Sequence, residues 1–247
     1  MATWIVHLRV AERLLAVRDD LDPMYTAVGS IAPDSGIPDE TWETFDPPSE
    51  ITHFRRSEAD PQPCADLAFY REHVLPAVNA DGTRDRISFL LGYFSHLVVD
   101  NLWHTEISLP AEAKHAEQFA ADPRFIWEVK RDWYGLDFEY VRAHSDSLFW
   151  TALVPAVPAD TYLEFLPLEA VGQRLDYIKT FYQRTDEEVE ERLMRRERIY
   201  LTHERMDGFV ERAADRFLRI LDHLTCHADS IPSHLPSALD LPGVESS

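Results

Sequence analysis

The chain has 247 residues and a formal net charge of −20, because 44 Asp and Glu residues outnumber 24 Lys and Arg residues. This length is ample for a sizeable core, and a hydrophobic content of 45% excludes a disordered chain. A surface this acidic repels polyanions, so we expect no stable binding to nucleic acid.

The first half of the chain predicts three helices and one long connection. A helix is expected from Thr3, its N-cap, to Val17, with apolar residues along one side. Residues 19–61 hold many Pro, Asp, Ser and Gly residues and are expected to form a connection with little regular structure. Helices follow over 66–78 and 84–107, and the second of these is the most apolar of the chain. It is therefore expected at the centre of the fold.

The second half continues with helical periodicity. Helices are expected over 111–133, 137–153 and 169–184, and a long charged helix over 186–226, where Thr185 and Glu188 form a capping box. Only 8 Gly residues are present and period-2 alternation is nearly absent, which disfavours a β fold. The predicted fold class is therefore all-α: a multi-helix bundle around a central apolar helix, with one domain over 1–230 and a flexible tail over 231–247.

Two features bear on where the protein works. The two cysteines, Cys64 and Cys226, allow neither a disulfide framework nor a CxxC zinc motif. A secretory leader is not expected, because His7 interrupts the first apolar stretch. The most apolar segment, residues 87–99, is too short to cross a bilayer. These features predict a cytoplasmic protein without a transmembrane segment, and they leave the oligomeric state open.

The central predicted helix carries a polar stripe. His96, Asp100 and His104 are spaced i, i+4 and i+8, and each step of four residues turns only about 40° around a helix. Burial of such a stripe without partners would cost several kcal/mol. A hydrogen-bonded Asp–His network and a bound metal would both satisfy it, and the stripe alone does not decide between them.

Three residues outside this helix strengthen the metal hypothesis. His7 lies among apolar residues of the first helix, Asp34 follows Pro33 in the turn AVGSIAPDSG, and His53 lies in ITHF. Imidazole and carboxylate ligands together suit zinc, manganese or iron. The sequence therefore predicts a divalent metal site built from distant segments.

The order of these motifs resembles the zinc-dependent phospholipase C family, which is related to secreted single-strand-specific nucleases. An N-terminal His is followed by a GSIAPD-type turn, a THF-type His and a helix of the LGYFSHLVVDNLWH type, over roughly the first 110 residues. The segment that joins LLGY to His96 and Asp100 is the most specific part. A lone HxxxD would be a weak signal, whereas the ordered set of five is fairly specific.

The resemblance implies a role for each matching residue. Asp34, His53, His96 and Asp100 match the ligands of one zinc ion, and Asp100 would bridge to a second zinc ion that His7 also binds. A water between the metals would be the nucleophile, with Asp34 as the catalytic residue that orients it or acts as general base. The implied function is hydrolysis of a phosphodiester or phospholipid-like substrate, a small molecule or a lipid.

The chain departs from the family pattern at its start. In the family, the mature N-terminal residue is a Trp whose amine and carbonyl bind the second metal. Here the chain reads Met1-Ala2-Thr3-Trp4, so that ligand set is missing or replaced.

A second departure concerns the family's third zinc ion. That ion uses a His six residues after the helical Asp, whereas His104 follows Asp100 by four, and the next HxxxD pair is His203 with Asp207. We include His104 among the candidate metal ligands and expect two zinc ions rather than three.

Other candidates have structural interpretations. Glu112 and His115 supply half of a di-iron motif, but no second ExxH occurs. Asp132 and Asp137 could supply a carboxylate ligand, but we interpret them as caps of a helix that starts after Gly135. Several aromatic residues could line a pocket, although most are expected to pack in the core: Trp103, Trp127, Trp133, Tyr134 and Trp150.

A hypothesis from a different class remains open. A non-catalytic helical protein could retain the cluster as a structural metal site or as a polar core network, and loss of the N-terminal ligands fits such a protein. A metal phosphohydrolase of the HD type is disfavoured, because the sequence has no His-Asp dipeptide.

Overall fold

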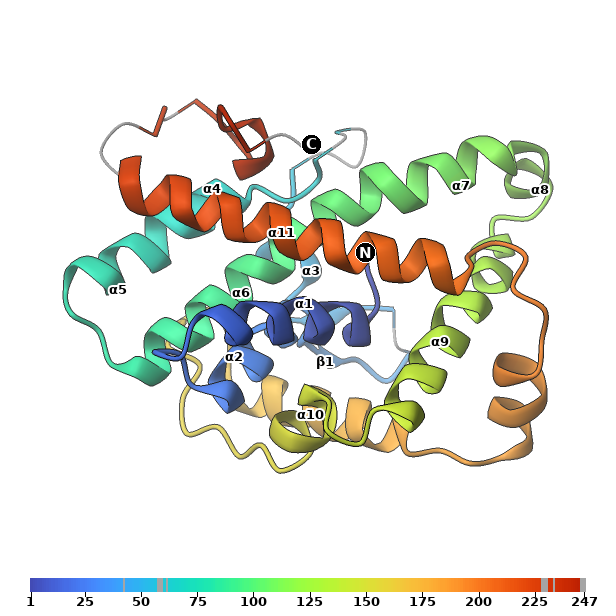
Figure 1. Ribbon diagram of the computed structural model, residues 1–247. Coiled ribbons are helices and arrows are strands. Elements are labelled where there is room, and N and C mark those ends of the chain that lie inside the picture. The colour runs from blue at the N-terminus through green and yellow to red at the C-terminus, as the bar shows by residue number, and fades with distance from the viewer. Residues whose placement is uncertain (42, 57–59, 61, 228–230, 233, 245–247) are drawn as a thin grey trace.

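A computed structural model describes residues 1–41, 43–56, 60, 62–227, 231–232 and 234–244. Helices dominate these residues, which confirms the predicted all-α class (Figure 1). The larger α-helices are α1 (Trp4–Val17), α2 (Pro23–Gly29), α6 (Arg84–Trp103), α9 (Phe125–Ala143), α10 (Leu168–Tyr182) and α11 (His203–His227). Shorter ones are α3 (Ser49–Thr52), α4 (Asp66–Phe69), α5 (Leu75–Asn79), α7 (Leu109–Lys114) and α8 (Ala116–Ala121).

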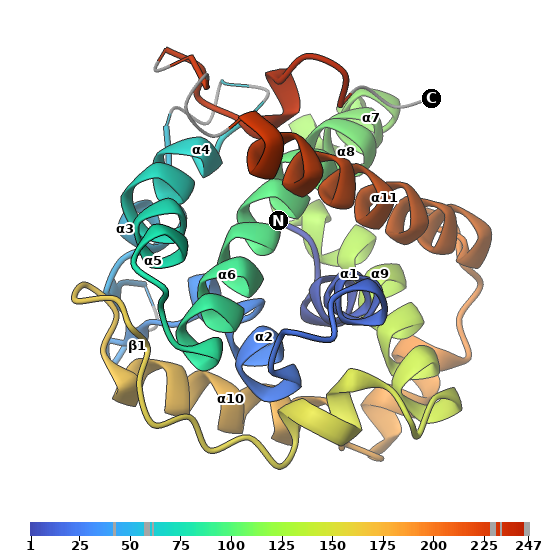
Figure 2. The ribbon, with the colours of Figure 1, turned by 60° about the vertical axis from the view of Figure 1, so that its left-hand side comes forward.

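Helix α6 lies in the middle of the bundle, as its composition predicts (Figure 2). Every residue from Ser88 to Trp103 is buried. Its start is fixed by Thr83, whose side chain accepts a hydrogen bond from the backbone N–H of Arg86. A helix buried on all sides can carry polar residues only where they find partners, so the polar stripe of α6 marks a special region.

Two glycines allow α2 to pack closely against α6. A Cβ atom at Gly29 would lie 2.1 Å from the carbonyl oxygen of Phe89, and one at Gly92 would lie 2.4 Å from that of Thr26. Any side chain at either position would force the backbones apart. This contact brings the turn after α2, with the 3₁₀ helix η1 (Ala32–Asp34), next to the middle of α6.

The connection over 19–61 has more regular structure than predicted. Asp22 caps α2 by accepting from the N–H of Tyr25, and Pro23 occupies the first turn of that helix, where its missing N–H costs nothing. The strands β1 (Ile37–Pro38) and β2 (Phe45–Asp46) form a short antiparallel pair, and α3 follows. Turn-forming residues therefore cap short elements here rather than replace them.

The predicted helix boundary at Gly135 is wrong, because α9 continues through it. A Cβ atom at Gly135 would lie 2.4 Å from the carbonyl oxygen of Leu193 and from the guanidinium of Arg198. The glycine thus permits close packing of another segment and does not end the helix. Asp132 and Asp137 lie inside α9, so their predicted capping of a new helix there is also wrong.

The long helix predicted over 186–226 is two separate elements. A π-helical segment covers Glu188–Met194, and α11 begins only at His203. Between them, the carboxylate of Asp132 accepts hydrogen bonds from the backbone N–H groups of Ile199 and Tyr200, at 2.8 and 2.6 Å. This distant partner replaces the hydrogen bonds that a continuous helix would make. The helix predicted over 111–133 is similarly divided into α7, α8 and the start of α9.

The sequence predicts a flexible tail over 231–247, of which residues 233 and 245–247 lie outside the described residues. Of its described residues, Ala238, Leu241 and Val244 are buried against the bundle.

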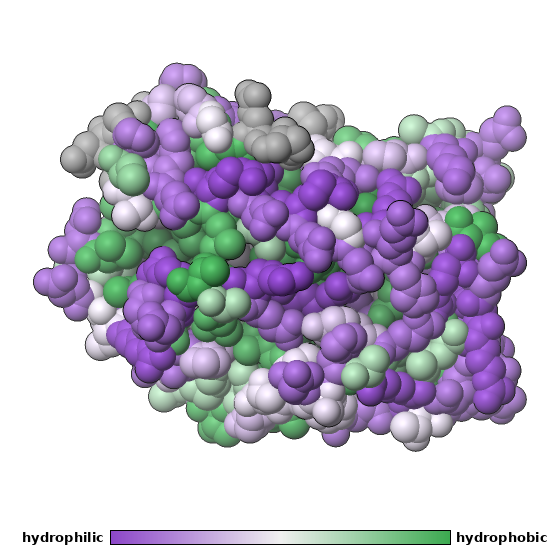
Figure 3. All heavy atoms as spheres, viewed as in Figure 1, coloured by the Kyte–Doolittle hydropathy of each residue, from purple (hydrophilic) through white to green (hydrophobic). Residues whose placement is uncertain are grey.

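Over the described parts of the chain, we find no helix with the length and apolar character needed to span a membrane. The face formed by α11 and α1 is mostly hydrophilic, as the net charge suggests (Figure 3).

Candidate metal centre

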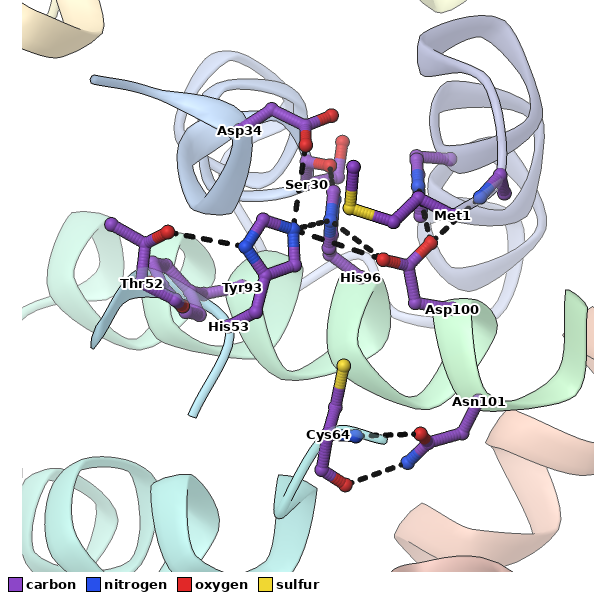
Figure 4. A network of polar contacts seen from close by, with 12 residues as sticks. Met1, Ser30, Asp34, Thr52, His53, Cys64, Tyr93, His96, Asp100 and Asn101 are labelled. Atoms are coloured by element: carbon purple, nitrogen blue, oxygen red, sulfur yellow. Dashed lines mark hydrogen bonds and ion pairs between the residues drawn. The ribbon is translucent and has the colours of Figure 1, made fainter. Parts of the chain in front are cut away.

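Five of the six predicted ligands converge inside the molecule. His7 comes from α1, Asp34 from η1, His53 from the residue after α3, and His96 and Asp100 from α6 (Figure 4). All are buried except Asp34, whose side chain is 13% exposed. Segments up to 93 residues apart thus bring titratable groups together in the core. This favours a ligand-binding role over the role of ordinary polar side chains that face solvent.

The distances within the cluster are short. The Nε2 atom of His53 lies 3.3 Å from Asp34 Oδ1, 3.7 Å from Asp100 Oδ2 and 3.3 Å from His96 Nε2. His96 Nε2 is 3.6 Å from Asp100 Oδ2, and His7 Nε2 is 3.5 Å from Asp100 Oδ1. The rings of His7 and His96 stack with centroids 3.7 Å apart. Donor atoms of all five side chains therefore face one small volume.

Backbone and hydroxyl groups orient two of the imidazoles. His96 Nδ1 lies 2.9 Å from the carbonyl oxygen of Ser30, which can only accept, so Nδ1 carries the proton and the lone pair of Nε2 faces the cluster. His53 Nδ1 lies 3.1 Å from the hydroxyl of Thr52. Outer partners of this kind fix the tautomer of metal-binding histidines in known sites.

Several buried atoms of the cluster lack hydrogen-bond partners. Both ring nitrogens of His7 and the Oδ2 atom of Asp100 are unpaired in this sense. Buried polar atoms are normally satisfied, and leaving one without a partner costs about 1–3 kcal/mol. His7 Nε2 and Asp100 Oδ2 lie beside other ligand candidates, so a cation among them would remove the cost for these two atoms. The donor set thus fits a divalent metal.

Protonation states also suit a metal. Burial, together with the neighbouring His7, lowers the pKa of His96 to about 3, so its imidazole is neutral at pH 7. Burial alone would raise the pKa of Asp34, but the hydrogen bond from His53 and the interaction with His96 outweigh it and hold the pKa below the ordinary range. Burial also opposes the ionisation of Asp100, but the N-terminal amine, His96 and His7 outweigh it and hold the pKa of Asp100 well below its usual value. Neutral imidazole and ionised carboxylate are the ligand forms of these groups.

Two triplets of ligand atoms could each hold an ion. One consists of His7, His96 and Asp100, the other of Asp34, His53 and His96, and within each the atoms lie within 4.8 Å of one another. The two oxygens of Asp100 point to different partners, Oδ1 to His7 and Oδ2 to His53 and His96. A carboxylate in this position can bridge two ions.

The start of the chain reaches the same cluster. The backbone N–H of Ala2 donates to Asp100 Oδ1 at 2.7 Å, and the side chain of Met1 lies beside the cluster (Figure 4). The departure from the family pattern at this point therefore falls directly on the candidate site.

The remaining predicted ligand, His104, is not part of either triplet. It lies eight residues after His96, where the accumulated turn of about 80° has rotated it away from the stripe. It lines a separate cavity of about 270 Å³ with Asp100, Arg55 and Glu112. The HxxxD pair also lies elsewhere, because His203 contacts Glu139 and Asp207 pairs with Arg9.

A larger cavity of about 370 Å³ opens onto the cluster. Asp34 and His53 line it, and so do two cationic side chains, Lys130 of α9 and Arg174 of α10. Of the aromatic residues noted in the sequence, Trp127, Trp133 and Tyr134 line this cavity, together with Trp4. Sequence reasoning missed Lys130 and Arg174, which lie outside the recognisable motifs and carry no local signal.

Comparison with known proteins identifies a family for the first half of the chain. Residues 6–127 match a protein family described as zinc dependent phospholipase C. This segment runs from α1 to the start of α9 and contains all five clustered residues. No curated protein and no solved structure matches the chain.

Proposed function

We propose that the protein is a zinc-dependent enzyme that hydrolyses a phosphodiester or phospholipid-like substrate, because residues 6–127 match the zinc-dependent phospholipase C family. The observation that carries the proposal is the buried cluster of unpaired His and Asp atoms at the edge of a cavity. A purely structural core would be expected to satisfy these atoms internally.

We propose that the two triplets hold two zinc ions. Asp34, His53, His96 and Asp100 would hold one ion, and His7, with Asp100 and the shared His96, would hold the other. Zinc bound in this way supplies a Lewis acid that polarises phosphoryl oxygens and lowers the pKa of water. Ser30 and Thr52 would hold the rings of His96 and His53 in the productive orientation.

Asp34 is the proposed catalytic residue. Among the five clustered residues it has the most exposed side chain, and it lines the cavity, so substrate can reach it. Its low pKa keeps it ionised at neutral pH, so it can accept a hydrogen bond from water and orient that water toward the substrate. We also propose that residues 1–230 form one catalytic domain. The cytoplasmic location and the lack of nucleic acid binding stay predictions.

One observation favours a second candidate function. The backbone N–H of Ala2 already donates to Asp100 Oδ1, and Met1 lies beside the cluster, so the start of the chain fills part of the space around the triplet of His7, His96 and Asp100. A structural metal site without catalysis would accommodate this arrangement, because such a site needs no open coordination position.

The experiment that separates these two functions is elemental analysis combined with a hydrolysis assay. We expect about two zinc ions per chain after purification without chelator, and zinc-dependent hydrolysis of bis(p-nitrophenyl) phosphate. Asp34→Asn should lower kcat at least roughly a hundredfold, as expected for loss of a general base. Zinc binding without hydrolysis of any phosphodiester would favour the structural site. A folded protein that takes up no zinc would refute both.

A further inference from the structure

Two cations in the cavity are not needed to build the His/Asp cluster. Lys130 and Arg174 line the cavity together with Asp34 and His53. Both lie beyond residue 127, where the family match ends. They are therefore features that the second half of this chain adds to the site.

Arg174 is held by aromatic rings rather than by a carboxylate. Its guanidinium carbon lies 5.8–5.9 Å from the ring centroids of Trp4, Phe45 and Tyr177. Its buried Nε atom has no hydrogen-bond partner, and we find no ion pair to it within the described ranges. Aromatic faces stabilise a guanidinium without using its N–H groups, which remain able to bind an anion in a bidentate way.

Lys130 of α9 also lies against aromatic rings. Its ammonium lies 5.0 Å from the ring centroid of Trp127 and 6.0 Å from that of Trp133. Burial lowers the pKa of Lys130, while the charges of Asp34 and Asp100 oppose this effect. The part of the chain that the structure describes offers Lys130 no carboxylate in direct contact, although the protein as a whole has a net charge of −20.

The charge balance calls for a further anion. Two zinc ions and the carboxylates of Asp34 and Asp100 would together carry a net positive charge. This charge would already exceed the single negative charge of a phosphodiester. Two more cations in the same cavity would therefore face uncompensated positive charge unless the substrate carries a second anionic group. A quaternary ammonium group at this place would meet repulsion instead.

We propose that Lys130 and Arg174 form an anion subsite that binds a second negatively charged group of the substrate, a phosphate or a carboxylate, next to the ester that is cleaved. The identity of the ester and the charge balance rest on the proposed function, whereas the lack of a carboxylate contact to Lys130 and Arg174 among the described residues does not. The subsite makes the enzyme selective for anionic phosphodiesters over those with an ammonium head.

The first test measures binding of inorganic phosphate to metal-free protein by isothermal titration calorimetry. The wild type should bind phosphate at one saturable site, and Lys130→Gln and Arg174→Gln should each weaken binding roughly tenfold, as for loss of a charge-assisted hydrogen bond. Lys114→Gln and Arg13→Gln, which change exposed cations elsewhere, should bind like the wild type. Circular dichroism checks that the variants fold. No binding by the wild type, or equal binding by all variants, would overturn the subsite.

The second test uses zinc-loaded protein and two chromogenic phosphodiesters with the same p-nitrophenol leaving group. One carries a carboxylate on its other ester group and the second a trimethylammonium. The wild type should prefer the carboxylate substrate in kcat/KM, mainly through KM, and both variants should lose the preference. Hydrolysis without any preference would refute the subsite and spare the proposed function. If the protein binds no zinc and hydrolyses no phosphodiester, but binds phosphate through Lys130 and Arg174, the subsite is supported and the proposed function is refuted.

Discussion

Two polar clusters involve neighbouring residues of α6, and they differ in whether all their polar atoms have hydrogen-bond partners. Asp100 faces the His/Asp cluster, where it and His7 retain unpaired atoms. Asn101 faces away from it and hydrogen-bonds the backbone N–H and carbonyl of Cys64, at 2.9 and 2.8 Å, and also the carboxylate of Asp66 (Figure 4). The same helix therefore carries one polar cluster that is incomplete and one that is complete.

The complete cluster ties distant segments of the chain together. Asp66 accepts hydrogen bonds from Asn101 at 2.8 Å, and from the hydroxyl of Ser237 and the N–H of Ala238, both at 2.7 Å. Burial raises the pKa of Asp66 to about 6, against the opposing effect of these donors. A satisfied network of this kind holds the structure, whereas unpaired atoms that face one another are suited to a ligand. The difference between the two clusters can be tested directly.

The largest effect is expected for Asp100→Ala. Asp100 contacts His7, His53 and His96, so its loss should affect both proposed ions. We expect zinc affinity to fall roughly a hundredfold or more, beyond the 10–100-fold typical for loss of an outer partner. Zinc per chain by elemental analysis, together with competition against a chelator, measures this.

Two histidines provide matched controls for that variant. His104 lies one turn after Asp100, rotated away from the stripe and outside both triplets, and His203 contacts Glu139. His104→Ala and His203→Ala should retain both zinc ions. Loss of a whole equivalent in either variant would reveal a third metal site, and equal zinc content in Asp100→Ala and His104→Ala would contradict the assigned role of Asp100.

The next largest effect is expected for Asp66→Ala in the complete cluster. Its removal leaves donors of Asn101, Ser237 and Ala238 unpaired in the core, so the free energy of unfolding should fall by about 3 kcal/mol. Urea unfolding of the metal-free protein measures the change. Asp176→Ala on the exposed surface of α10 should change stability by less than about 0.5 kcal/mol. Zinc content should stay at the wild-type value, and its loss would mean that the two clusters are not independent.

A third buried carboxylate, Asp137, is expected to make the stability of the fold depend on pH. Asp137 accepts hydrogen bonds from the hydroxyls of Tyr182 at 2.5 Å and Thr3 at 2.9 Å. Burial nevertheless raises its pKa to about 7. Since the folded state then binds the proton more tightly than the unfolded state, this group stabilises the fold at low pH. That contribution is lost as pH rises from about 4 to 7.

Asp137→Asn should remove this part of the pH dependence and leave both hydroxyls a hydrogen-bond partner. Each unit of pKa difference corresponds to about 1.4 kcal/mol, so the variant should gain stability relative to the wild type between pH 5 and pH 8. Urea unfolding of both metal-free proteins at these two pH values measures the difference, and Asp66, present in both, cancels. Parallel pH profiles for the two proteins would show that Asp137 does not titrate in this range.

Local sequence predicted much of the candidate metal centre. The stripe on α6 follows from the helical period, and the ordered motifs are enough to identify His7, Asp34 and His53 as ligand candidates. The apolar length of α6 also determined its place at the centre. The stripe and the central place of α6 could be predicted because each depends on spacing within one segment, whereas His7, Asp34 and His53 were identified through the resemblance of the ordered motifs to a known family.

Tertiary structure decided where the helices of the second half end and what they bring to the site. Gly135 suggests a helix end, yet it serves the packing of residues 193–198, and Asp132 closes a turn almost 70 residues away. Lys130 and Arg174 meet the cluster only because α9 and α10 fold against its cavity. Contacts between distant segments leave no periodic trace in the chain, so the sequence specifies which side chains are present while packing decides which of them face one another.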